Sequence, residues 1–150
     1  MSKINVRIMK PEDFSAVLAI DEKVNKEKRE EYYKLKFEKL VKSEDYIPTS
    51  LVAEDENKKI VGFIMGELFI GEYGISEDRA KLDTIGVDPD YQNKGIGKLL
   101  LQEFIEHLKS LGVEKISTLV AWNDIELIKF FSSNNFEPSK TIHLEYKILI

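Results

Sequence analysis

The sequence contains no cysteine. This excludes a disulfide framework, thiolate metal ligands and a cysteine nucleophile. No apolar run is long enough to span a bilayer, and residues 1 to 10 lack the apolar stretch of a secretory signal. An excess of positive charge is also missing, because 22 Lys and Arg stand against 27 Asp and Glu, a formal net charge of −5. We therefore expect a cytoplasmic protein with neither a nucleic acid nor a membrane as partner.

What is present is the composition of a globular domain. The chain has 150 residues, of which 43% are hydrophobic and 33% are charged. This length suits one domain with a proper core and is short for two. No repeat and no Pro-, Gly- or Ser-rich linker divides the sequence, so we expect a single domain over residues 1–150.

The periodicity of apolar residues predicts alternating strands and helices. Period-two or continuous apolar segments indicate strands at 3–9, 51–54, 60–70, 82–87, 115–122 and 142–150. Helical spacing indicates helices after Pro11, within the charged segment 21–43, over 97–111 and from Asn123 or Asp124 to 133. The order is β-α-α-β-β-β-α-β-α-β. Close spacing of the early strands favours antiparallel pairing, whereas the later β-α-β unit favours parallel pairing. We predict an α/β fold with a mixed, mostly antiparallel sheet flanked by helices.

The most informative segment is residues 83–100, where a strand is followed by a polar loop and a strongly amphipathic helix. A helix start offers unpaired N–H groups and the positive end of the helix dipole. Gly95 and Gly97 let a ligand approach this backbone closely, and Lys94 and Lys98 add positive charge. The segment therefore predicts an anion site that suits phosphate.

Two familiar phosphate loops do not fit this segment. A dinucleotide-binding loop needs a third glycine at the position of Leu100. A nucleoside triphosphate loop needs glycine at the position of Gln92 and Ser or Thr at that of Leu99. An ordinary glycine turn that caps a core helix, and a nucleotide site of another kind, stay open on these residues alone.

The remaining pattern, Gln92-x-x-Gly95-x-Gly97 after a strand and Asp88-Pro89, resembles the coenzyme A pyrophosphate loop of the GNAT family of N-acetyltransferases. The element order over residues 82–136 is similar to the acetyl-CoA half of that family, and the N-terminal strand and two helices resemble its acceptor half. The resemblance implies a single-domain GNAT-like fold over nearly the whole chain. The closing signature of the family is matched in part, by Asn123, Phe130-Phe131 and Asn135-Phe136.

The resemblance implies transfer of an acetyl group from acetyl-CoA, the cosubstrate, directly to a primary amine acceptor without a metal. It places pantetheine along the strand edge near residues 85 to 87, whose backbone N–H would stabilise the oxyanion. The implied cofactor-binding residues are Ile85, Gly86, Val87, Gln92, Asn93, Lys94, Gly95, Ile96, Gly97, Lys98, Asn123, Phe130 and Phe131.

Asp83 is the first candidate for the general base or for a ligand of the acceptor, because it lies inside an otherwise apolar strand. Strand parity would place it on one face with Ile85 and Val87. Glu72 is the second catalytic candidate, and Glu67 and Tyr73 are rivals.

The tyrosine that protonates the leaving thiolate in many family members is replaced here by Phe131, which cannot donate a proton. Another group, water, or no acid at all would then serve, since a thiol with a pKa near 8.5 leaves fairly easily. A non-catalytic acyl-CoA-binding or sensor module is the alternative function. We expect Trp122 in the core, and a monomer or a homodimer.

Overall fold

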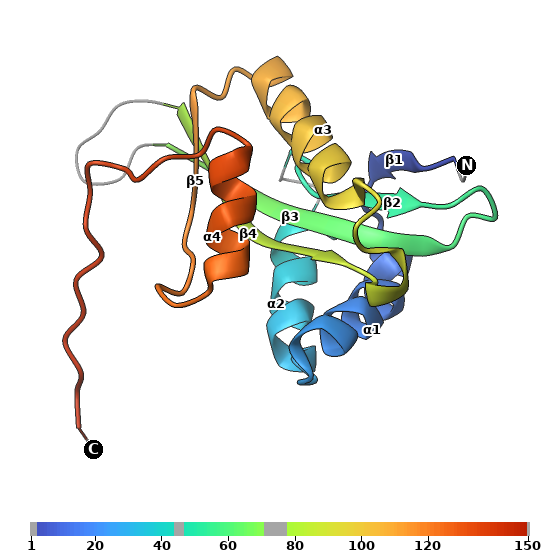
Figure 1. The fold of residues 1–150 in the computed structure, drawn as a ribbon, viewed down its shortest axis with the longest axis horizontal. Coiled ribbons are helices and arrows are strands. Elements are labelled where there is room, and N and C mark those ends of the chain that lie inside the picture. The colour runs from blue at the N-terminus through green and yellow to red at the C-terminus, as the bar shows by residue number, and fades with distance from the viewer. Residues whose placement is uncertain (1–2, 44–46, 71–77, 150) are drawn as a thin grey trace. The chain divides into compact units, whose positions relative to one another are not determined.

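The computed structural model describes residues 3–43, 47–70 and 78–149. By its internal contacts the chain divides into two compact units, Met1–Leu119 and Val120–Ile150, which are described separately. The first unit contains a five-stranded sheet in the order β1-β2-β3-β4-β5 (Figure 1).

The sheet follows the predicted pairing. Its strands are β1 (Asn5–Ile8), β2 (Leu51–Glu54), β3 (Ile60–Ile70), β4 (Asp78–Val87) and β5 (Lys115–Thr118). The first three pairings are antiparallel and the pairing of β4 with β5 is parallel. The prediction of a mixed, mostly antiparallel sheet is thus confirmed. β4 begins earlier than predicted and β5 ends earlier.

Helices cover both faces of this sheet (Figure 1). The short turn η1 (Pro11–Asp13) leads into α1 (Phe14–Asn25), and α2 (Glu30–Leu40) follows. Together α1 and α2 enclose a core against one face, and its largest fully buried rings are Tyr33, Phe37 and Phe63. The turn η2 (Pro89–Tyr91) precedes α3 (Ile96–Ser110), which covers the other face.

The side of the sheet under α3 is built around glycines of β3. A Cβ atom on Gly62 would lie 3.0 Å from Leu100 Cδ1, and one on Gly66 would lie 2.7 Å from Phe104 Cε1. The glycines therefore let the helix approach the strand backbone closely. α3 ends as predicted, with Gly112 in the left-handed conformation at φ +84°.

An irregularity of register interrupts β4. Met65 pairs with Thr84, but the next residue, Gly66, pairs with Leu82, so Asp83 has no partner on β3. This is a β-bulge with one extra residue in β4.

The bulge changes which face each side chain of β4 takes. Asp83 and Thr84 both contact residues of α2, whereas Val87 pairs with Gly62, whose missing Cβ points at α3. Ile85 pairs with Ile64 in the same phase as Val87. The prediction that Asp83 shares a face with Ile85 and Val87 is therefore wrong, because the extra residue shifts the alternation.

The second unit, Val120–Ile150, contains α4 (Ile125–Ser133). The Asp124 side chain caps this helix by accepting a hydrogen bond from the N–H of Leu127 at 3.2 Å. The ring of Phe131 lies 5.4 Å from that of Phe130 and 5.0 Å from that of Phe136, and Phe131 is buried.

Two predictions about this unit are wrong. Residues 142 to 149 form no strand, and the alternating side chains Ile142, Leu144, Tyr146 and Ile148 are exposed. Alternation alone does not make a strand, which needs a neighbour to accept and donate its ladder of hydrogen bonds. Trp122, expected in the core, is 86% exposed.

We expect Gly66→Ala to lower the free energy of unfolding by about 1–3 kcal/mol, because the new methyl group overlaps the Phe104 ring. Urea denaturation of the wild type, G66A, F104L and the double variant measures this as a double-mutant cycle. The double variant should lose less than the sum of the single losses. Additive losses would show that the Phe104 ring is not what opposes a side chain at residue 66.

Candidate functional site

The loop between β4 and α3 is anchored by Asp88. Its side chain is 3% exposed, and its carboxylate accepts hydrogen bonds from the N–H of Asp90 at 3.0 Å and from Lys23 Nζ at 3.2 Å. Its own N–H donates to the carbonyl of Val61 at 2.8 Å. Burial alone would raise the pKa of Asp88, but these donors hold that pKa below its usual range. The loop is thereby fixed to α1 and β3.

The loop then presents backbone N–H groups at the start of α3. Asn93 and Gly95 adopt the left-handed conformation, and a Cβ atom on Gly95 would meet nothing within 4 Å. The first hydrogen bond into the helix runs from the N–H of Leu99 to the carbonyl of Gly95 at 3.0 Å. The N–H groups of residues 96 to 98 precede this bond, so they need acceptors from outside the helix.

The charge near these N–H groups is positive. Lys94 and Lys98 are exposed, and Lys94 Nζ lies 5.4 Å from the centre of the Tyr91 ring. The Gln92 side chain donates to the carbonyl of Val87 at 3.1 Å, which ties the loop to the end of β4. An open left-handed glycine, outward N–H groups and two lysines together suit a phosphate group.

β4 leads into this loop with one edge unpaired. β5 pairs with β4 only from Arg79 to Leu82, where Thr118 Oγ1 donates to the carbonyl of Leu82 at 2.9 Å. Within the described residues no strand lies beside residues 83 to 87 on the side that β5 leaves. The free backbone of this edge can pair with an extended ligand as with a further strand.

Asp83 lies on the opposite face of β4, the face covered by α2. Its carboxylate, 3% exposed, accepts a hydrogen bond from Lys36 Nζ at 3.0 Å, and Lys81 Nζ lies 3.9 Å away. Burial alone would lower the pKa of Lys36, but the hydrogen bond to Asp83 leaves that pKa above its ordinary value. Glu67, the rival candidate, is paired with Lys39 at 2.5 Å.

A second polar network joins α1 and α2 to the bulge. Arg29 holds the buried Asp21 through two hydrogen bonds of 2.9 and 2.6 Å and donates to Tyr33 Oη at 3.3 Å. Tyr33 Oη lies 3.5 Å from Thr84 Oγ1. Burial raises the pKa of Tyr33 well above its ordinary value, so its hydroxyl stays protonated.

The other predicted site residues are distributed as follows. Ile85, Gly86 and Val87 lie on β4, and residues 92 to 98 form the loop and the start of α3. Asn123, Phe130 and Phe131 belong to the unit Val120–Ile150, and their contact with a cofactor stays a prediction. Glu72 and Tyr73 lie outside the described residues.

The polar partners of β4 on α2 were not predicted. A helix was expected within the charged segment 21–43, but without the contacts that Tyr33 makes with Thr84 and Lys36 with Asp83. Their spacing of three residues puts both side chains on one face of a helix, and that signal was present in the sequence.

The described part of the chain brings no three His, Asp or Glu side chains together as a metal site. It also has no helix long and apolar enough to cross a membrane.

A family model described as "Acetyltransferase (GNAT) family" matches residues 14–136. The chain belongs to the GNAT family. The resemblance that the glycine loop suggested is confirmed, and so is the GNAT-like fold.

Relatives of this GNAT chain are named as acetyltransferases of different substrates. Spermine/spermidine N(1)-acetyltransferase of Bacillus subtilis (strain 168) is 30% identical in an alignment of 139 residues, which covers 89% of this chain and 88% of that protein. Mycothiol acetyltransferase of Propionibacterium freudenreichii is 34% identical over 91 residues, 61% of this chain. This match spans only 28% of that relative's length. A ribosomal protein bS18 alanine N-acetyltransferase of Salmonella typhimurium is 29% identical over 103 residues, and that match spans 62% of its length.

A solved structure has the same fold. Aminoglycoside N-acetyltransferase AAC(6')-Iy in complex with CoA superposes with a TM-score of 0.81 and 15% identity, covering 98% of this chain and 96% of the other.

We expect acid to remove the stabilisation supplied by Asp21. Burial alone would raise the pKa of this carboxyl, but the hydrogen bonds from Arg29 and its neighbours lower it. The folded state then binds fewer protons than the unfolded state, so stability is full at neutral pH. This stabilisation is lost as the pH falls from about 4, the ordinary pKa of an aspartate in the unfolded chain, through the lowered pKa of Asp21 in the folded state.

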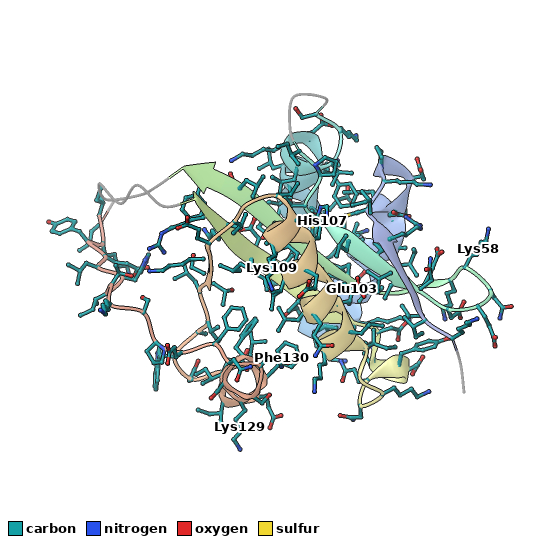
Figure 2. The ribbon with its side chains drawn as sticks, turned by 90° about the horizontal axis from the view of Figure 1, so that it is seen from above. Lys58, Glu103, His107, Lys109, Lys129 and Phe130 are labelled. Atoms are coloured by element: carbon teal, nitrogen blue, oxygen red, sulfur yellow. The ribbon has the colours of Figure 1, made fainter. Side chains whose placement is uncertain are left out.

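Asp21→Asn should lower the free energy of unfolding at pH 7 by about 2 kcal/mol, since Arg29 keeps partial access to water. It should also flatten the pH dependence between about pH 2 and 5. Urea denaturation across that range measures both effects. Glu103→Gln, on the exposed face of α3 (Figure 2), is the control and should leave the profile unchanged. An unchanged profile in D21N would contradict the assignment.

Proposed function

We propose that this chain is an N-acetyltransferase that moves the acetyl group of acetyl-CoA directly to a primary amine. The observation that carries the proposal is the continuity of the free edge of β4 with the open N–H groups at the start of α3. The edge offers backbone pairing to an extended chain, and the helix start offers an anion site at its end. Membership of the GNAT family and the named relatives support the same reaction.

Each part of this site has a chemical role in the proposal. The N–H groups of residues 96 to 98, with Lys94 and Lys98, bind the pyrophosphate of the cofactor. Backbone N–H groups among residues 85 to 87 stabilise negative charge on the carbonyl oxygen. Acetyl-CoA supplies the thioester carbonyl that the amine attacks.

Asp83 binds the acceptor amine and takes its proton in this proposal. A primary amine with a pKa near 10 is mostly protonated at neutral pH and must lose a proton before it can attack. The bulge turns Asp83 away from the α3 face and toward α1 and α2, so the acceptor reaches the strand from that side. Glu72 keeps its place as the second candidate base.

The wider setting is proposed on the composition of the chain. We propose a single catalytic domain over residues 1–150 that acts in the cytoplasm as a monomer or a homodimer. With a formal net charge of −5, it would need neither a nucleic acid nor a membrane as partner.

Thermal melting with and without acetyl-CoA tests the cofactor site. At 100 times its dissociation constant a ligand stabilises by about 2.7 kcal/mol, which raises Tm by several degrees. Gly95→Val should abolish this rise. Gly112→Val is the matched control, because Gly112 has nearly the same positive φ and equally open surroundings at the other end of α3. It should cost similar stability and keep the rise. If acetyl-CoA does not raise the Tm of the wild type, the proposed function is wrong.

A second candidate function is acyl-CoA binding without turnover. Phe131 at the place of the usual tyrosine favours it, and so does the ion pair that Asp83 already makes.

Release of free thiol from acetyl-CoA in the presence of primary amines distinguishes the two functions. For the enzyme, Asp83→Asn should lower kcat/KM by about 10²–10⁴-fold, the usual contribution of a general base, while the acetyl-CoA melting shift persists. No thiol release with any amine, despite the melting shift, would favour the binding module.

A further inference from the structure

The ammonium group of Lys36 lies between a carboxylate and an aromatic ring. Its Nζ donates to the carboxylate of Asp83 at 3.0 Å and lies 5.7 Å from the centre of the Tyr32 ring. A buried carboxylate and an aromatic face are the two groups that bind alkylammonium ions best. Both groups face the same nitrogen, which is carried on an unbranched four-carbon chain.

The other cations nearby are placed differently. Lys81 Nζ stands 3.9 Å from Asp83 and its side chain is 42% exposed, whereas that of Lys36 is 22% exposed. Lys39, one turn further along α2, is paired with Glu67. Arg29 lies 5.1 Å from the Tyr32 ring but holds Asp21. Lys36 alone, among these described residues, combines the hydrogen bond to Asp83 with the Tyr32 ring.

We propose that Lys36 occupies the ammonium position of the acceptor site, and that the natural acceptor is an unbranched alkylammonium that displaces it. The inference rests on the proposed function, in which Asp83 receives the acceptor. Acceptors of this class carry the amine on a flexible chain of methylenes, as polyamines and lysine side chains do.

The exchange keeps the charges of the site balanced. Asp83 loses one ammonium and gains another, so no buried carboxylate is left unpaired. The Lys36 side chain is partly exposed, which gives its released ammonium access to water. Because the acceptor binds only when Asp83 is free, its apparent affinity is reduced by the fraction of molecules in that state. Lys36 therefore acts as a competitor built into the chain.

Steady-state kinetics with n-butylamine, which matches the lysine side chain, tests this competition. If Lys36 holds Asp83 in about nine molecules of ten, Lys36→Met should lower KM about tenfold and leave kcat within about threefold. Lys39→Met removes the same charge from the same helix without touching Asp83, and should leave KM unchanged. Lys36→Arg restores a cation at Asp83 and should keep KM near the wild-type value. An unchanged or raised KM in a folded K36M protein would overturn the inference.

A binding measurement without acetyl-CoA separates this inference from the proposed function. Lys36→Ala removes the resident chain, so n-butylammonium chloride should raise its Tm by several degrees above the effect of equal sodium chloride. The wild type and Lys39→Ala should show a smaller rise, because Lys36 competes for Asp83 in both, and the double variant K36A/D83N should show none. If K36A gains no more than the wild type, the inference fails. Thiol release by the wild type with any amine tests the proposed function independently, so either idea can fail alone.

Discussion

At the bulge of β4 one residue, Asp83, has no partner on β3, and the candidate site depends on this residue. Without the bulge, Asp83 would follow the alternation of Ile85 and Val87 and face α3. With it, a carboxylate and a hydroxyl stand side by side toward α2, while the residues that follow return to the other phase. The same position marks the end of pairing with β5, so the strand edge becomes free where the carboxylate appears. One local irregularity thus brings together a backbone edge and an acid.

The rest of the first unit holds these two features still. Asp88 fixes the loop to α1 and β3, and Tyr33 joins α2 to Thr84 beside the bulge. The two networks use buried carboxylates whose cationic partners are Lys23 of α1 and Arg29, the residue before α2. The charged helices cover the core, and α2 also supplies polar partners for β4: Tyr33 for Thr84 and Lys36 for Asp83. The loop, in contrast, keeps its N–H groups unmatched at the start of α3.

Local patterns in the sequence predicted most of the elements. The strands at 51–54 and 60–70, the helix that Gly112 ends and the cap at Asp124 all form with the expected residues. These features depend on neighbours in the chain, through periodicity and cap chemistry. The bulge at Asp83 was not predicted, although β4 carries a sign of it: the apolar residues change phase from Ala80 and Leu82 to Ile85 and Val87. The pairing of Lys36 with Asp83 could not be predicted, because it joins residues 47 positions apart and Lys36 is one of many cations in its segment. The alternating pattern at 142–150 predicted a strand that does not form in residues 142 to 149. Alternation shows only a propensity for a strand, and no strand among the described residues pairs with these residues.

The contact between Gly66 and the ring of Phe104 has a mechanical consequence for the loop. α3 begins at the loop, and the Phe104 ring lies against Gly66 of β3 eight residues after the first residue of the helix, about 12 Å along its axis. At that point the distance between α3 and the sheet is set by the Phe104 ring, which packs directly on the backbone of Gly66. Any change in the thickness of the support would tilt the helix and move its first turn, and the N–H groups there would no longer point where they do. The direction in which the anion site faces is therefore determined in part by a hydrophobic residue that no ligand touches.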